Sequence, residues 1–420
     1  MTANTTPEFK QQLNAFFENQ MPAYMQLLRD MVAINSFTAN PFGVNKLGKM
    51  TAEVFAPLGF SSETVQSVHA MYGRHLILTR PSKNQAAPKI GLVSHLDTVF
   101  PPDEEERNDF RWRQEGDRIY GPGVVDIKGG TIMIYMLLSA VQTFAPDIFD
   151  AVTWVVLLDA NEETGGRDFG KLCVQHLGED ALACLVFEPG NWEKDGNKFH
   201  LVASRKGMAV YRLTVDGRAA HAGSAHEEGA NAVLQMAEVI QRICGFTDYG
   251  RFLTFNVGTV AGGTVINRVP HFASASVEMR AFDEAVFTEG LANMVALDGL
   301  STVQSADGTY ACRVNVEVYT KVAPWPRNAA NLRLIDIWHE AGAACGYVIV
   351  PEDRGGLSDG NFIWHMIPTL DGLGPAGGNA HCSERSEDGS KEQEYVLQSS
   401  FVPKAVLNTM SILKLIGSNC

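Results

Sequence analysis

Three apolar, β-branched runs in the first half of the chain each end in polar side chains. The runs cover residues 89–93, 151–158 and 181–187 and have the composition of buried strands. The polar residues that follow them are His95 and Asp97, Glu162 and Glu163, and Glu188. Helical patterns separate the runs, so the chain is expected to form an α/β sheet. Because ligands bind at the carboxyl ends of the strands in such a sheet, these side chains are predicted to meet at one edge.

Two further residues complete this set. Asp126 lies in the turn-rich segment 121–130, which opens an apolar helix predicted from 131 to 144, and His381 ends the Gly/Pro-rich segment 372–381. Imidazole and carboxylate groups are the donors that zinc takes in catalytic sites, and a pair of ions needs a bridging ligand. Asp126 is the candidate bridge. Neighbouring side chains diverge, so one of Glu162 and Glu163 is expected to bind metal and the other to act as a base.

The order of these motifs resembles a known family. His-x-Asp, Gly-x-Gly-x-x-Asp-x-Lys-Gly, Glu-Glu-x-Gly, Phe-Glu-Pro and a distal His are similar, in that order, to the co-catalytic zinc metallopeptidases of the glutamate carboxypeptidase, aminoacylase and acetylornithine deacetylase type. The resemblance implies two Zn²⁺ per chain, with Co²⁺ or Mn²⁺ as alternatives. The roles it implies are His95 and Glu188 as ligands of one ion, Glu163 and His381 as ligands of the other, Asp126 as the bridge, Glu162 as the general base, and Asp97 as the residue that orients His95.

The activity implied by the resemblance is hydrolysis of an amide bond next to a free carboxylate. The substrate would be a small peptide or an N-acyl amino acid, as for a carboxypeptidase or a deacylase. Two alternatives remain open. Residues 356–360 match the Gly-x-Ser-x-Gly elbow of serine hydrolases, with Ser358, Asp371 and His381 in triad order, although no buried strand runs directly into Ser358. The other alternative is a metal-binding relative without catalysis, and the presence of Glu162 argues against it.

Charge and composition restrict the partners. The formal net charge of −14 disfavours nucleic acid and anionic membranes, and 420 residues exceed the size of a single core. The most apolar stretch of predicted helix, residues 131–141, is shorter than the roughly 20 residues needed to cross a bilayer. Residues 1–8 lack the features of a secretory signal, and the seven cysteines are scattered. We therefore expect a cytoplasmic protein with no nucleic-acid or membrane partner.

The secondary-structure pattern changes twice along the chain. Residues 1–204 and 322–420 have the α/β pattern and are expected to form the catalytic zinc-binding domain, to which helix 331–343 and strand 347–350 belong. Residues 205–321 have the order βαββαβ of a ferredoxin-like domain. The elements expected there are strand 208–215, helix 229–244, strands 252–260 and 273–282, helix 284–297 and strand 312–320. With the resemblance, this implies a zinc-exopeptidase-like α/β domain with an inserted α+β lid and dimerisation domain.

The inserted domain carries three more candidate residues. In dimeric relatives, the histidine that His221 resembles reaches the partner subunit's active site and stabilises the oxyanion, which implies a homodimer formed through this domain. Asn267 and Arg280 match positions that hold the substrate carboxylate, and an arginine can bind a carboxylate through two hydrogen bonds. Glutamate-selective relatives have another arginine after the last inserted strand. Residues 320–325 lack it, so a preference for glutamate is not predicted.

Overall fold

The computed structural model describes residues 6–84 and 86–418, and the chain divides into two compact units. The first unit comprises Met1–Ala203, Arg327–Asp353 and Ser358–Cys420, and the second comprises Ser204–Pro326 and Arg354–Leu357. Residues 1–5, on which the expectation about a secretory signal partly rests, lie outside the described residues, as does Cys420. The six cysteines in the described part of the chain are free thiols.

The second unit extends further than the predicted 205–321. Arg205 pairs with Trp325 in an antiparallel bridge, and the amide of Lys206 donates to the carbonyl of Arg354 across 3.1 Å. Trp325, in the segment between the last inserted strand and the next helix, is completely buried. These contacts attach both the Trp325 segment and residues 354–357 to the unit.

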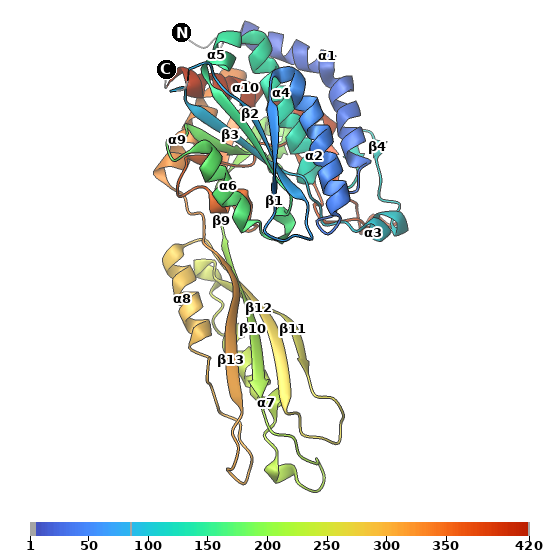
Figure 1. The fold of residues 1–420 in the computed structure, drawn as a ribbon, viewed down its shortest axis with the longest axis vertical. Helices are drawn as coiled ribbons and strands as arrows, with labels where there is room; N and C mark the ends of the chain where they lie inside the picture. Colours follow the sequence, from blue (N-terminus) through green and yellow to red (C-terminus); the bar gives the residue numbers. More distant parts are fainter. Residues whose placement is uncertain (1–5, 85, 419–420) are drawn as a thin grey trace. The chain divides into compact units, whose positions relative to one another are not determined.

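A mixed six-stranded sheet forms the centre of the first unit (Figure 1). In spatial order its strands are β1 (Ser61–Gln66), β2 (Arg74–Arg80), β6 (Thr153–Asp159), β3 (Lys89–His95), β7 (Ala183–Val186) and β15 (Thr369–Leu370). The last four are parallel, as expected, whereas β2 runs antiparallel to both β1 and β6. The connection between β1 and β2, residues 67–73, accounts for the antiparallel pairing of these two strands, because a parallel crossover needs a dozen or more residues.

Helices cover both faces of this sheet because successive side chains of each strand point to opposite faces. On β3, Leu92 belongs to the larger core and Val93 to the smaller one. The larger core is formed with α1 (Pro7–Val32), α2 (Pro41–Phe55), α4 (Gly129–Phe144), α9 (Ala329–Cys345) and α10 (Phe401–Gly417), and the smaller one with α6 (Arg167–Leu177). Burial on both faces explains why the middle of β3, residues 90–93, has no polar side chain.

The apolar helix is longer than the sequence predicted. The turn η2 (Val124–Lys128) continues directly into α4, so Val124–Phe144 forms one segment of 21 residues. By length and composition this segment is able to cross a membrane, which corrects the prediction that no such span exists. However, 83% of its most apolar window is buried inside the protein, as in a core helix.

Two small sheets flank the central one. One contains β14 (Val348–Arg354), β9 (Lys198–Arg205) and β8 (Asn191–Glu193); the other contains β16 (Gly377–Gly378), β17 (Tyr395–Leu397), β5 (Arg118–Tyr120) and β4 (Arg113–Glu115). The strand predicted at 347–350 exists as β14, but it pairs with β9 and not with the central sheet. The second half of the chain therefore contributes only β15 to that sheet. Two short helices, α3 (Pro102–Arg107) and α5 (Pro146–Ala151), lie in loops.

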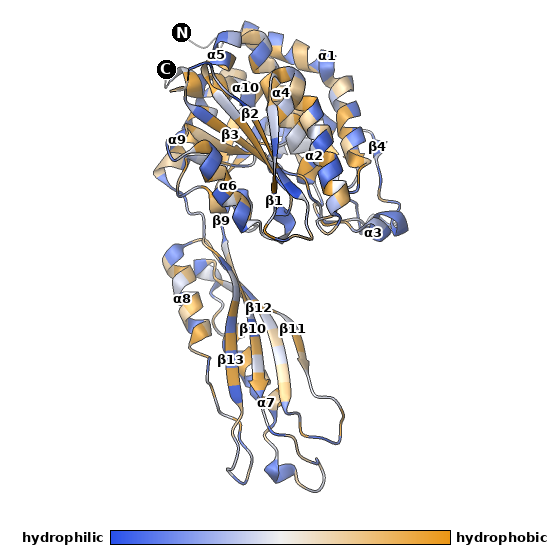
Figure 2. Ribbon diagram, in the orientation of Figure 1, coloured by the Kyte–Doolittle hydropathy of each residue, from blue (hydrophilic) through white to orange (hydrophobic). Residues whose placement is uncertain are grey.

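The second unit has the predicted ferredoxin-like topology. Its antiparallel sheet has the order β11 (Thr254–Gly262), β12 (Phe272–Ala281), β10 (Gly207–Asp216) and β13 (Arg313–Val322). Alternate residues of β10, such as Tyr211 and Leu213, are buried with residues of α7 (Ala232–Cys244) and α8 (Glu284–Val295). In Figure 2 the strands of this unit change between hydrophobic and hydrophilic along their length, as expected for a sheet covered by helices on one face.

Candidate metal centre

Asp126 lies between the two predicted histidine ligands. Its Oδ1 is 3.1 Å from His95 Nε2, and its Oδ2 is 3.4 Å from His381 Nε2. Burial raises the pKa of Asp126, but its hydrogen bonds with His381 and His95 outweigh this and hold the pKa below its ordinary range. Asp126 is therefore an ionised carboxylate that directs one oxygen to each imidazole, as a bridging ligand requires.

The two remaining candidate ligands divide between the histidines. Glu163 Oε2 is 3.1 Å from His381 Nε2, and Glu188 Oε1 is 3.9 Å from His95 Nε2. Donor atoms of His95, Asp126 and Glu163 all lie within 4.8 Å of one another. Nitrogen and carboxylate donors grouped in this way fit zinc-like metal chemistry; His95 and Glu188 would hold one ion, and His381 and Glu163 would hold a second.

The two histidines of this centre lie in different surroundings: one is at a buried strand end and the other is in an exposed turn. His95 is the last residue of β3 and its side chain is 1% exposed. His381 follows β16, has a positive φ of 67°, and its side chain is 54% exposed. A non-glycine residue in this backbone region is uncommon, and such residues are concentrated at functional sites.

Glu162 lies beside these ligands in the short helix η3 (Glu162–Thr164), directly after β6 and the loop residues 160–161. Burial raises its pKa well above the ordinary value. The charge of His95 lowers the pKa, and those of Glu188, Glu163 and Asp126 raise it further. A carboxylate with a raised pKa is suited to take up a proton near neutral pH. Its neighbour Glu163 contacts His381 instead.

Asp97 lies beside Nδ1 of His95 and offers it two acceptor oxygens. His95 Nδ1 is 3.0 Å from the backbone carbonyl of Asp97 and 3.4 Å from its carboxylate Oδ1, so the carbonyl makes the closer contact. The carboxylate accepts hydrogen bonds from the amides of Glu162 (3.1 Å) and Glu163 (3.3 Å) and from Thr38 Oγ1 (2.6 Å). One residue thus orients His95 and also fixes the backbone of η3.

Glu394 is a functional candidate that the sequence reasoning missed. Its buried Oε1 accepts hydrogen bonds from the amides of Val125 (2.9 Å) and Asp126 (3.1 Å). Glu394 and His381 belong to one hairpin between β16 and β17, which therefore carries a ligand and also supports the bridge. The polar segment before Glu394 concealed this role, because only the folded hairpin brings residue 394 behind residue 126.

His221 and Asn267 lie together in the second unit. The amide of Ala222 donates to the carbonyl of Asn267 across 3.0 Å, and His221 forms an antiparallel bridge with Arg268. His221 Nδ1 accepts hydrogen bonds from the amides of Gly223 and Ser224, both at 3.1 Å. In a neutral ring this assigns the proton to Nε2, which becomes a donor. Both side chains are exposed.

Arg280 is placed at the other end of β12. Its Nε donates to Glu278 Oε1 across 2.7 Å, and its Nη1 donates to the carbonyl of Gly355 across 3.0 Å. Eight strand residues separate Arg280 from the start of β12, about 26 Å at roughly 3.3 Å per residue. Asn267 precedes that start. One carboxylate therefore cannot contact both Asn267 and Arg280 of the same chain.

Comparison with known proteins identifies the family of this chain. Residues 91–396 match the model of "Peptidase family M20/M25/M40", which is the greater part of the chain and contains all five candidate ligands. The chain belongs to peptidase family M20/M25/M40. The predicted resemblance, the α/β fold with its lid-type second unit, and the classification as a metal-dependent amide hydrolase of carboxypeptidase or deacylase type are thereby confirmed.

Individual relatives of this M20 protein are similar over most of its length. Carboxypeptidase G2 of Pseudomonas sp. (strain RS-16) is 26% identical over 374 residues, covering 88% of this chain and 85% of the relative. Succinyl-diaminopimelate desuccinylase of Albidiferax ferrireducens is 24% identical over 379 residues, covering 86% and 92%. The crystal structure of a tripeptidase from Staphylococcus aureus has the same fold, with a TM-score of 0.73, 21% identity, and coverage of 94% of this chain and 98% of that one.

The serine-hydrolase alternative does not fit this M20 protein. Ser358 is buried and caps the short helix η7 (Asp359–Phe362), and its Oγ donates directly to Asp371 Oδ2 across 2.8 Å. A catalytic triad requires the imidazole to lie between serine and aspartate. His381 instead faces Asp126 and Glu163. The Gly-x-Ser-x-Gly match is therefore a helix cap and not a nucleophile elbow.

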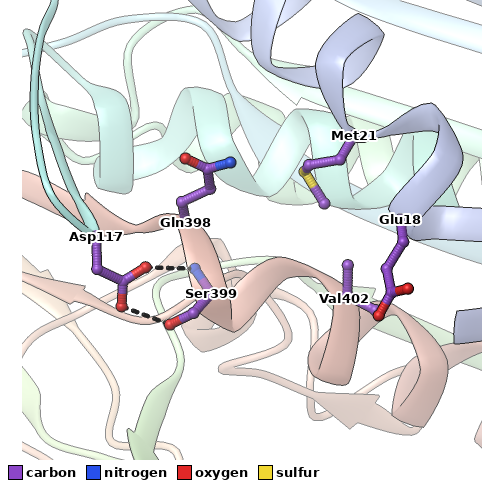
Figure 3. Close-up of a pocket in the computed structure, with 6 residues that line it drawn as sticks. All are labelled: Glu18, Met21, Asp117, Gln398, Ser399 and Val402. Carbon is purple, nitrogen blue, oxygen red and sulfur yellow. Dashed lines mark hydrogen bonds between the residues drawn. The ribbon is translucent and has the colours of Figure 1, made fainter.

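A pocket in the first unit involves none of the candidate site residues. Figure 3 shows its lining residues Glu18, Met21, Asp117, Gln398, Ser399 and Val402, which come from α1, the turn between β4 and β5, the short helix η8 (Gln398–Ser400) and the start of α10. Asp117 accepts hydrogen bonds from the amide (2.8 Å) and the hydroxyl (2.5 Å) of Ser399. Its carboxylate thus attaches the turn to η8, just before α10, and is not a chemical group of the candidate metal centre.

Proposed function

We propose that this M20 protein is a two-zinc hydrolase that cleaves the amide bond next to a free carboxylate in a small peptide or an N-acyl amino acid. The position of Asp126 carries this proposal, since each of its oxygens faces one histidine. A carboxypeptidase and a desuccinylase among the relatives support the substrate class. The free thiols of the described cysteines, together with the net charge of −14, support a cytoplasmic location.

The residues around the centre can perform the acid-base steps of this reaction. When bound, zinc ions polarise a carbonyl and lower the pKa of water. Glu162 would take the proton of the attacking water, and its raised pKa suits that role. The same carboxyl group would then deliver the proton to the leaving amine. Asp97 keeps Glu162 in place by accepting the hydrogen bond of its amide.

We further propose a homodimer in which His221 and Asn267 act on the neighbouring active site. Their separation from Arg280 along β12 supports this arrangement. Asn267 of one chain and Arg280 of a second copy could contact the same substrate carboxylate, which the two residues of a single chain cannot. Exposed apolar side chains on this unit offer a surface for the second copy: Val233, Leu234, Val260, Val265, Ile266 and Phe272. Several of them lie on or beside β11, an edge strand whose outer hydrogen-bonding groups can pair with another chain.

Metal analysis combined with a substrate panel tests the proposal. Protein purified without a chelator should contain two transition-metal ions per chain by elemental analysis, and it should hydrolyse at least one member of a panel of N-acetyl and N-benzoyl amino acids and dipeptides. Asp126→Asn should lower the occupancy of both positions and abolish hydrolysis. Asp336→Asn, which changes an exposed carboxylate on α9, is the matched control. A fully active preparation without bound metal would refute the proposal.

A further inference from the structure

A buried histidine lies between two carboxylates near the loop that carries the proposed base, Glu162. His75, on β2, has a side chain that is 2% exposed. Its Nδ1 is 3.0 Å from Asp159 Oδ1, and its Nε2 is 3.1 Å from Asp168 Oδ2. The ring of Phe169 packs against the imidazole with centroids 5.4 Å apart. Neither the metal centre nor the proposed substrate contacts account for this group.

Both carboxylates also accept hydrogen bonds from backbone amides in segments close to Glu162. Asp159 Oδ1 accepts a hydrogen bond from the amide of Asn161 across 2.9 Å, and Asp168 Oδ2 accepts one from the amide of Val68 across 2.7 Å. Ser67 Oγ, next to Val68, donates to the side-chain oxygen of Asn161 across 3.1 Å. His75 therefore connects two segments that meet at Asn161, the residue immediately before the proposed base.

The surroundings of His75 favour its charged form. Burial lowers the pKa of His75, but hydrogen bonds with Asp159 and Asp168 and their charges raise it to about 9. The amide of Ala160 donates a hydrogen bond to Nδ1 across 3.2 Å, which favours a neutral ring, whereas the two carboxylates at 3.0 and 3.1 Å favour the charged ring, and we give them the greater weight. We therefore assign an imidazolium.

Two further carboxyl groups belong to this environment. Asp97 and Asp359 face Asp159. Burial, together with the charges of Asp159 and Glu162, raises the pKa of Asp359 well above its ordinary value. His75 is the basic side chain in contact with Asp159.

We propose that His75 is a positioning residue for Glu162, because as a cation between Asp159 and Asp168 it fixes the Asn161 segment from which Glu162 projects. This inference rests on the proposed role of Glu162 as the base. Since Glu162 acts on the bound substrate, the loss of His75 should lower turnover and leave substrate binding almost unchanged. Deprotonation of His75 should have the same effect, so turnover should fall as the pH rises through about 9.

The test compares His75→Gln with His339→Gln, which changes an exposed histidine on α9, by steady-state kinetics across pH 6–10.5 on the best substrate of the panel. His75→Gln should lower kcat roughly 10–100-fold, as for other residues that orient a metal-site group, with KM changed by less than about twofold. Its remaining activity should lack the decrease near pH 9. NMR of ¹³C-histidine-labelled protein should show a resonance that titrates near pH 9 and is missing from His75→Gln.

Asp168→Asn gives a second measurement if His75→Gln fails to fold. Removing one of the two negative charges lowers the pKa of His75, so both the decrease in kcat and the NMR titration should move to lower pH. Unchanged kcat in His75→Gln, or a His75 resonance that titrates below pH 7, would overturn the inference. Glu162→Gln is assayed in parallel: full activity there would refute the proposed function itself, whereas an inactive Glu162→Gln beside a fully active His75→Gln would refute only the role of His75.

Discussion

The metal centre in the first unit and the His221 turn in the second unit are built in different ways. The metal centre collects side chains from strand ends and one hairpin, and the buried carboxylates of Asp97 and Glu394 hold its backbone. The His221 turn is exposed, and neighbouring amides in the same turn hold its imidazole. The first arrangement is fixed by tertiary contacts and the second by local ones.

This difference indicates which parts of the reaction one chain can perform. Donor atoms that are already grouped need little rearrangement to bind metal, so the first unit should load metal by itself. His221 is exposed, and in the proposed dimer a second surface would exclude water from it and so strengthen it as a hydrogen-bond donor. Changes in the two regions should therefore have separable effects on metal content and on turnover.

The largest expected effect tests whether the first unit supplies both the metal ligands and the general base. Glu162→Gln should lower kcat by ~10²–10⁴-fold, because it removes the proposed general base, and it should retain both metal ions. Glu163→Gln should release one ion, since its carboxylate faces His381. Kinetics together with elemental analysis distinguish the two. Equal metal loss in both variants, or a fully active Glu162→Gln protein, would contradict the separation of base and ligand.

The next effect tests the dependence of the second unit on a partner. His221→Ala should lower kcat by ~10²–10³-fold through loss of an oxyanion donor, with metal content unchanged. A heterodimer of His221→Ala and Glu162→Gln chains, purified through two different affinity tags, should regain one active site. His226→Ala, which changes an exposed histidine in the same loop, is the control. No recovery in the heterodimer would show that His221 serves its own chain.

A smaller effect concerns substrate selectivity. A substrate carboxylate that binds Arg280, as predicted, would compete with Glu278, and a charge-assisted hydrogen bond contributes about 1.5–3 kcal/mol. The free acid should therefore exceed its amide by roughly one to two orders of magnitude in kcat/KM, and Arg280→Ala should remove most of that preference. Arg242→Ala, on the exposed surface of α7, should not. Equal rates for acid and amide in the unmodified protein would mean that Arg280 forms only an intramolecular ion pair.

Loss of Glu394, which accepts the amide hydrogen bonds of Val125 and Asp126, should have an effect of about the same size as loss of Arg280, or smaller. Glu394→Ala should weaken metal binding by ~10–100-fold, because the amides of Val125 and Asp126 lose their acceptor. Glu394→Gln should stay within a few-fold of the unmodified protein, since its amide oxygen can accept the same hydrogen bonds. Competition with a metal-binding dye measures both, with Glu387→Ala as an exposed control. Equal affinities in all variants would show that the bridge does not need this support.

The smallest expected effect is on the pH dependence of thermal stability. The pKa of His75 is raised from 6.5 to about 9, so its ion pairs stabilise the fold fully below pH 6.5 and lose that contribution as the pH rises through 9. The shift corresponds to about 3 kcal/mol. Thermal unfolding should therefore show a Tm difference of a few degrees between the unmodified protein and His75→Gln at pH 6.5 that is lost by pH 10. A difference that does not depend on pH would assign His75 a packing role only.

The sequence by itself determined the residues that carry the chemistry and the order of the elements. Apolar runs that end in His95, Glu162, Glu163 and Glu188 show which side chains leave the sheet at its carboxyl edge, because strand burial is a local pattern. The change from the α/β pattern to βαββαβ likewise located the second unit. Its carboxyl boundary was misplaced, since residues 354–357 join it only through contacts with distant segments.

Only the tertiary structure decided how these residues are supported. Asp97 holds η3, Glu394 holds the turn of Asp126, and the length of β12 separates Asn267 from Arg280. Short-range periodicity cannot reveal these relations, because each depends on segments that are distant in sequence or on a distance in space. A hydrogen bond between residues 394 and 126 leaves no pattern in either neighbourhood; it exists because the hairpin of β16 and β17 packs behind the bridging aspartate.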